Sequence, residues 1–171
     1  MKQSLKISIA SVAFCAAVWL AGCTTSSSDP KSSISSTAAT KPDSAAKAGW
    51  SIDLSKAEAQ AKAENKLVVM DFTGSDWCPW CIKLDKEVFA TPEFSDFAAK
   101  NLVLVEVDFP RLKPQSGKLI KANRALQSKY KIEGYPTVIV LDSDGKKVGE
   151  LGYEEGGPKP FIEKLEKLKK G

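Results

Sequence analysis

The chain has 171 residues, a formal net charge of +4 and four cysteines, and it contains no histidine. So small a net charge gives no basis for binding nucleic acid. Without histidine, Ser-His-Asp and Cys-His catalytic groups are excluded and a closed zinc site lacks ligands, so we expect no metal and no other cofactor.

The first 22 residues have the form of a bacterial lipoprotein signal peptide. Two lysines precede an apolar run over residues 7–20, which is shorter than the roughly 20 residues that a membrane span needs. The run ends in Leu-Ala-Gly before Cys23, which resembles a lipobox. This resemblance implies that Cys23 is lipidated and anchors the protein in a lipid bilayer. An ordinary cleaved signal followed by a chance cysteine is the alternative.

The residue after the lipidated cysteine bears on which membrane holds the anchor. Thr24 occupies this position, where an aspartate would have suggested retention in the inner membrane. We therefore expect a protein of the cell envelope that faces the periplasm or the exterior, with the outer membrane favoured.

Residues 23–49 are predicted to form a flexible tether behind this anchor. After Cys23 the stretch is mostly Ser, Thr, Ala, Lys and Pro, and Ile34 is its only large apolar residue. Such a segment cannot bury enough apolar surface to offset the entropy lost on ordering. A glycosylated or partner-binding stalk is the alternative. In either case the folded domain comprises residues 50–171.

The first half of this domain is predicted to alternate helices and strands. We place Ser55 as the cap of the first helix and Thr91, which precedes a proline, as the cap of a later one. The expected elements are a helix to about residue 65, a buried strand 66–72, a helix 78–89, a helical piece 91–100, a strand 102–108 and a loop 109–117.

The second half is predicted to contain a hairpin between two helices. A helix 118–130 precedes a β-branched strand 137–141, a turn 142–145, a strand 147–151 and an amphipathic helix 160–170. A short strand near residues 50–52 is a candidate edge. Alternation makes the first two strands parallel, and the short turn makes the last pair antiparallel. This order predicts an α/β protein with a central mixed β-sheet and helices on both faces.

The sequence Trp-Cys-Pro-Trp-Cys, residues 77–81, is the strongest functional signal in the chain. Cys78 follows a buried strand and begins a helix, where free N–H groups and the helix dipole favour a thiolate. Cys81 lies one turn on, within reach to close a disulfide with Cys78. So short a loop stabilises little through chain entropy, which favours redox chemistry over a structural disulfide or half a metal site. We expect the sulfur of Cys78 to lie bare at the helix tip.

The motif and the order of elements together resemble the thioredoxin superfamily, in particular its exported, single-domain bacterial branch. The resemblance covers nearly all of residues 50–171. It rests on the strand before the motif, on Gly-Tyr-Pro-Thr at 134–137, on the Asp-Gly turn at 144–145 and on the last helix. It implies a thioredoxin-like fold and thiol–disulfide exchange on exported proteins with cysteines. The partner would be a membrane electron donor or acceptor.

The resemblance also implies catalytic roles for three residues. Cys78 is the nucleophile that attacks a substrate disulfide, and Cys81 then resolves the mixed disulfide. Asp71, an acid in a buried strand, is the carboxylate with a raised pKa that relays the proton of Cys81. Six residues separate Asp71 from Cys78, one more than in ordinary thioredoxins, so its carboxylate is open to displacement.

Four further residues are expected to bind substrate. Pro136 matches the family's cis-proline, which would turn the backbone of Tyr135 toward the cysteines and offer it to an extended substrate. Trp77 and Trp80 flank and split the motif, and one of them is expected to be exposed beside Cys78. The alternatives are that Trp77 and the ring of Tyr135 only pack.

The direction of the reaction depends on the groups around the thiols. The Pro-Trp between the cysteines matches neither the Gly-Pro of thioredoxins nor the Pro-His of strong oxidants, and the missing histidine argues against a strong oxidant. Asp76 is expected to raise the thiol pKa, with Lys83 as an offset. We therefore expect a reductase or isomerase-like enzyme. The alternatives are a membrane-anchored chaperone for Cu(I) or Zn and a redox-silent docking module.

Overall fold

The computed structural model describes residues 46–170, so the predicted signal peptide, Cys23 and most of the predicted tether lie outside the described residues. No helix in residues 46–170 combines the length and the apolar character that crossing a bilayer requires. The elements in chain order are β1 (Trp50–Ser51), α1 (Leu54–Glu64), β2 (Leu67–Thr73), α2 (Pro79–Leu84), η1 (Asp85–Phe89), α3 (Pro92–Asn101), β3 (Leu102–Asp108), α4 (Gly117–Tyr130), β4 (Thr137–Leu141), β5 (Lys147–Leu151) and α5 (Pro158–Lys170).

The five strands form one mixed sheet in the order β1-β3-β2-β4-β5. β1 and β2 run parallel to β3, whereas β4 is antiparallel to β2 and β5 is antiparallel to β4. Every residue of the central strand β2 is buried, as expected for a strand covered on both faces. In this register Asp71 lies between Glu106 of β3 and Val138 of β4. The predicted mixed α/β sheet is confirmed, including the short edge strand.

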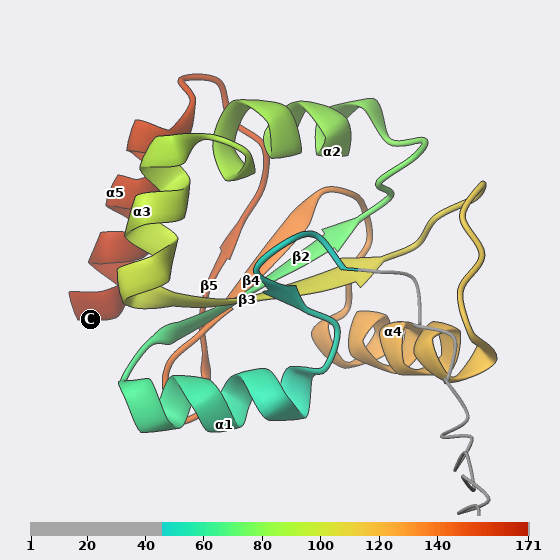
Figure 1. Ribbon diagram of the computed structural model, residues 1–171, viewed down its shortest axis with the longest axis horizontal. Helices are drawn as coiled ribbons and strands as arrows, with labels where there is room; N and C mark the ends of the chain where they lie inside the picture. Colours follow the sequence, from blue (N-terminus) through green and yellow to red (C-terminus); the bar gives the residue numbers. More distant parts are fainter. Residues whose placement is uncertain (1–45, 171) are drawn as a thin grey trace, which may run out of the picture. The chain divides into compact units, whose positions relative to one another are not determined.

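The two faces of the sheet have separate apolar cores. Figure 1 shows α2, α3 and α5 on one side of the sheet and α1 and α4 on the other. Along β2, Val69 packs into the core under α2, η1, α3 and α5, whereas Met70 and Phe72 pack into the core under α1 and α4. Because strand side chains alternate between faces, Asp71 lies on the face that α2 covers. The extra residue before Cys78 therefore does not turn Asp71 to the other face.

Three helix beginnings differ from the prediction by one or two residues. Asp53, rather than Ser55, caps α1, and its carboxylate accepts the N–H of Lys56 at 3.2 Å. Ser116 caps α4, which therefore begins one residue early, and α5 begins at Pro158. Either of two nearby polar residues can cap a helix, and the backbone conformation around them decides which one does.

The helix predicted over residues 78–89 changes its geometry halfway. α2 ends at Leu84 and continues as η1, a π-helix, and the N–H of Ala90 closes the wide turn on the carbonyl of Asp85 at 2.7 Å. A π-turn takes one more residue than an α-turn. Val88 and Phe89 of η1 are both buried in the core beneath it.

Candidate active site

The two cysteines of the motif are joined as a disulfide at the beginning of α2. The Cα atoms of Cys78 and Cys81 are 5.2 Å apart, and Cys78 is the N-cap residue. Its Sγ lies 3.2 Å from the backbone N of Cys81 and accepts that N–H. The same N–H and the positive end of the helix would stabilise a thiolate on Cys78 once the disulfide is reduced.

Both sulfurs are more enclosed than the sequence predicts. The exposed fraction is 4% for Cys78 and 3% for Cys81, so the expectation of a bare sulfur is wrong for this oxidised form. Cys78 follows the fully buried strand β2 as the N-cap of α2, and Cys81 is a buried residue of that helix. An incoming thiolate therefore meets little open sulfur surface until neighbouring side chains move.

Asp71 lies beneath this helix in a cluster of charges. It is 2% exposed, and its Oδ2 lies 3.7 Å from the Nζ of Lys47. Burial raises the pKa of Asp71 to about 7; Lys47 opposes this rise, whereas Glu106 and Asp85 add to it. A carboxyl group of this kind can both take and release a proton near neutral pH.

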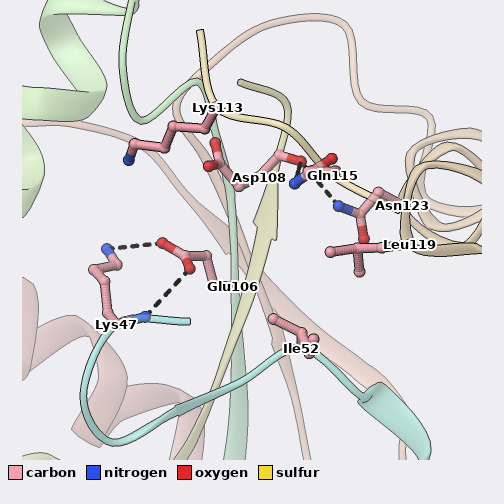
Figure 2. Close-up of a pocket in the computed structure, with 8 residues that line it drawn as sticks. All are labelled: Lys47, Ile52, Glu106, Asp108, Lys113, Gln115, Leu119 and Asn123. Carbon is pink, nitrogen blue, oxygen red and sulfur yellow. Dashed lines mark hydrogen bonds and ion pairs between the residues drawn. The ribbon is translucent and has the colours of Figure 1, made fainter. Parts of the chain in front are cut away.

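The charge cluster continues to the helix that carries Cys81. Lys47 also pairs with Asp85 at 2.7 Å and with Glu106 at 3.9 Å. The N–H of Asp85 donates to the carbonyl of Cys81, so this carboxylate stands one helical turn after the resolving cysteine. Burial raises the pKa of Glu106 as well, with Lys47 acting against it. Figure 2 shows Lys47 and Glu106 held together by side-chain and backbone contacts.

Sequence reasoning missed these three partners of Asp71. A signal existed for Glu106, an acid within an apolar strand, and for Asp85, four residues after Cys81. No signal marked Lys47, because it comes from the end of the predicted tether and reaches the site only through the folded backbone.

The two tryptophans of the motif have different surroundings. Trp77 donates from Nε1 to the carbonyl of Phe109 at 2.8 Å, and the guanidinium of Arg111 lies 3.9 Å from its ring centre. Trp80 is 55% exposed and its ring lies 5.4 Å from that of Tyr153. Trp80 is thus the exposed aromatic beside the cysteines, and Trp77 packs beneath the loop.

The loop before β4 lies against the cysteine motif. The Tyr135–Pro136 bond is cis, as predicted. The ring of Tyr135 meets Trp77 edge-on with the ring centres 5.9 Å apart, and its hydroxyl oxygen accepts the side-chain N–H of Gln127 at 2.8 Å. The ring of Tyr135 therefore packs against Trp77 of the motif.

The expected effects of Asp76 and Lys83 on the pKa of the Cys78 thiol stay predictions, since the two cysteines are bonded in the disulfide. The carboxylate of Asp76 accepts backbone N–H groups of Arg111, Leu112 and Lys113, which lower its pKa. Lys83 instead pairs with Glu87 and Glu155. Asp76 thus holds the loop after β3 in place.

Among residues 46–170, no group of three or more Cys, Asp or Glu side chains is placed to hold a metal ion. The chemistry that the arrangement supports is that of the cysteine pair. A mixed sheet with helices on both faces, a disulfide at a helix N-terminus and a cis-proline loop against it define a thiol–disulfide oxidoreductase of the thioredoxin fold.

Comparison with known proteins gives the family. Residues 54–169 match the family described as "Thioredoxin-like domain", and the chain belongs to this family. It is 36% identical over 126 residues to "Disulfide bond reductase DsbH" of Chlamydia pneumoniae. The matched region covers 74% of this chain and 75% of that protein. It is 34% identical over 110 residues to "Thioredoxin-related protein DsbJ" of the same organism, but spans 32% of that protein's length and 63% of its own.

A solved structure supports the same assignment. The structure titled "DsbH Oxidoreductase" superimposes with a TM-score of 0.65 at 32% sequence identity, covering 74% of this chain and 90% of the other. This similarity supports the thioredoxin-like fold of the chain.

Proposed function

We propose that this enzyme reduces or rearranges disulfides in exported proteins of the cell envelope. The observation that carries the proposal is the disulfide between Cys78 and Cys81 at the N-terminus of α2. The similarity to a relative named a disulfide bond reductase supports the reducing direction.

In the proposed reaction the reduced protein supplies two electrons. The thiolate of Cys78 attacks one sulfur of a substrate disulfide, and the other substrate sulfur leaves as a thiolate. Cys81 loses its proton, attacks the sulfur of Cys78 and releases the second substrate thiol. The protein is left with the Cys78–Cys81 disulfide, and a membrane electron donor must reduce it again before the next cycle.

Asp71 is proposed as the base that takes the proton of Cys81. The support is its burial on the face of the sheet that α2 covers, and a pKa that burial raises to about 7. A base with a pKa near the working pH balances proton uptake against release.

Three residues are proposed to receive the substrate, and a fourth, Trp77, to support them. The backbone of Tyr135, turned by the cis bond to Pro136, would pair with an extended substrate segment. Trp80 offers an exposed apolar ring next to Cys78. Trp77 would act through its contact with Tyr135, by keeping the cis-proline loop against the motif.

The protein is proposed to work from a lipid anchor at Cys23, in the envelope and with the outer membrane favoured. The lipobox-like residues 20–23 and the tether composition support this location. Nucleic acid is not a partner in the proposal.

A trapping experiment tests the exchange reaction. In a Cys81→Ala variant of the full chain, Cys78 can still attack but the mixed disulfide cannot be resolved, so envelope proteins should accumulate on it. The complexes are separated by non-reducing electrophoresis after thiols are blocked with N-ethylmaleimide. The matched Cys78→Ala variant should capture nothing. Equal capture by both variants, or by neither, would contradict the assigned roles.

The redox potential tests the direction. For a reductase we expect a potential nearer to the roughly −270 mV of thioredoxin than to the roughly −120 mV of a strong periplasmic oxidant. The measurement is equilibration of the cysteine pair against dithiothreitol buffers, with thiol alkylation as the readout. A value near the oxidant end would overturn the reducing direction and leave the exchange chemistry intact.

A further inference from the structure

A lysine from outside the region matched to the family is held at the centre of the carboxylates under the active site. Lys47 precedes residues 54–169, and its Nζ lies 3.7 Å from Asp71, 2.7 Å from Asp85 and 3.9 Å from Glu106. Burial alone lowers the pKa of Lys47, but the three carboxylates more than offset this, so its pKa is raised and it stays charged.

The backbone around Lys47 is fixed to the sheet by several contacts. The N–H of Lys47 donates to Glu106 at 3.4 Å, and its carbonyl accepts the N–H of Trp50 at 2.9 Å. The ammonium also lies 4.4 Å from the centre of the Trp50 ring and 5.2 Å from that of Phe89. The short segment 46–49, which we call the N-terminal arm, therefore places the cation in one position.

The other groups around Asp71 are acidic or apolar, so the positive charge beside it comes from Lys47 of the N-terminal arm. Glu106 comes from β3, Asp85 from η1, and the neighbour on β4 is the apolar Val138. Asp108 and Lys113 act in turn on Glu106, in opposite directions. Among the described residues, the ion pair within 4 Å of Asp71 is made by Lys47.

The cluster has a route to solvent. A cavity of about 110 Å³ adjoins it and is lined by Lys47, Glu106, Asp108, Lys113 and Gln115 among others (Figure 2). A polar space of this size holds several water molecules. Lys47 and Glu106 thus border this cavity, and Asp71 is not among the residues that line it.

We propose that Lys47 is a positioning residue that favours the ionised form of Asp71, in which Asp71 can accept the proton of Cys81. The arm thereby sets the pH range in which the cysteine pair works. This inference rests on the role proposed above for Asp71. The arm lies outside residues 54–169, the region matched to the family.

The test compares Lys47→Met with Lys62→Met. Lys62 is an exposed lysine paired with Asp144 at 3.4 Å, so its replacement removes the same charge away from the site. The full chain is reduced beforehand, and single-turnover reduction of insulin disulfides is followed from pH 5 to pH 9. Circular dichroism confirms that each variant is folded.

In Lys47→Met we expect the acid limb of the pH–rate profile to shift to higher pH by about one unit or more. An opposite charge at this distance lowers a carboxyl pKa by about that much, and the variant lacks it. Because the pKa of Asp71 is about 7, the rate at pH 7 should fall about fivefold or more and recover at pH 9. Lys47→Arg should restore most of the profile, and Lys62→Met should match the parent. A Lys47→Met profile identical to the parent, or a uniform loss at every pH, would overturn the proposal.

The Asp71→Asn variant separates the role of Lys47 from the proton-relay role of Asp71. In Asp71→Asn the profile should lose its dependence on the carboxyl group, and adding Lys47→Met should shift it no further. If Asp71→Asn leaves the profile unchanged, the proton-relay role fails and the role of Lys47 fails with it. If Asp71→Asn changes the profile but Lys47→Met does not, only the role of Lys47 is overturned.

Discussion

Asp71 is a carboxyl group in a place where negative charge is costly. Its Oδ1 is buried without a hydrogen-bond partner, and two further carboxylates stand close to it. Lys47 compensates part of this cost at 3.7 Å. Removing water from a charge is seldom fully repaid by one ion pair. The residue that suits proton transfer is therefore also a source of instability when it is ionised.

The stability of the folded protein should consequently fall as the pH rises through Asp71's titration. The pKa of Asp71 is about 7 in the folded state against an ordinary value of 3.8, so between these values the folded chain holds a proton that the unfolded chain has released. The free energy of unfolding therefore decreases as the pH rises, by a few kcal/mol over about three pH units. The pKa of Glu106 is also raised and acts in the same direction.

Asp71→Asn should remove most of this loss. At pH 8 the variant should be more stable than the parent by up to a few kcal/mol, and the difference should vanish near pH 4. Urea unfolding of the oxidised protein at several pH values measures it. Asp144→Asn, which alters an exposed carboxyl group, serves as the control. A constant difference between Asp71→Asn and the parent at all pH values would refute the assigned titration.

The turn between β2 and α2 sets the position of the motif through close packing. The N–H groups of Trp77 and Cys78 both donate to the carbonyl of Gly74, at 3.2 and 2.9 Å. A Cβ at Gly74 would lie 2.5 Å from the ring of Trp77. That ring cannot easily retreat, because it is bonded to the carbonyl of Phe109 and covered by Arg111. The turn therefore depends on the absence of a side chain at this position.

Gly74→Ala should displace the indole of Trp77 and disturb its contact with the cis-proline loop. We expect a loss of about 1–3 kcal/mol in unfolding free energy, the usual cost of overpacking, together with slower insulin reduction. Denaturant unfolding and the turnover assay measure the two effects. The control is Gly117→Ala at the beginning of α4, where a Cβ meets nothing within 4 Å. Equal behaviour of the two variants would contradict the packing argument.

How far the sequence predicts the structure depends on the range of the interactions involved. The strand 66–72 and the helix 118–130 were predictable within a residue because their apolar patterns repeat locally. The π-turn at η1 and the cap at Asp53 were not, since each depends on how the chain meets the core. The cysteine pair was clear from spacing, but its burial was not. Lys47 could not be foreseen, because its partners lie on three elements far along the chain.

The cysteine pair, the cis-proline loop and the buried Asp71 all lie on or directly beside the central strand β2 and its neighbours. β2 leads into the motif, β4 follows the cis-proline loop, and β3 supplies Glu106 beside Asp71. The proposed tether enters this arrangement through the N-terminal arm. Under the proposed attachment at Cys23, residues 24–45 could span at most roughly 75 Å from the membrane surface.

Attachment through Cys23 makes a prediction for the intact chain that is independent of the catalytic chemistry. Metabolic labelling with an alkyne-bearing palmitate should mark the parent protein and not a Cys23→Ser variant, because acylation requires that cysteine. Cys15→Ser is the matched control: its cysteine lies within the apolar segment before the lipobox, and we expect it to be labelled like the parent. Solubilised in detergent, all three proteins should reduce insulin at the same rate, since Cys78 and Cys81 are unchanged. Label on Cys23→Ser, or its absence from the parent, would show that the chain is held in the envelope in another way.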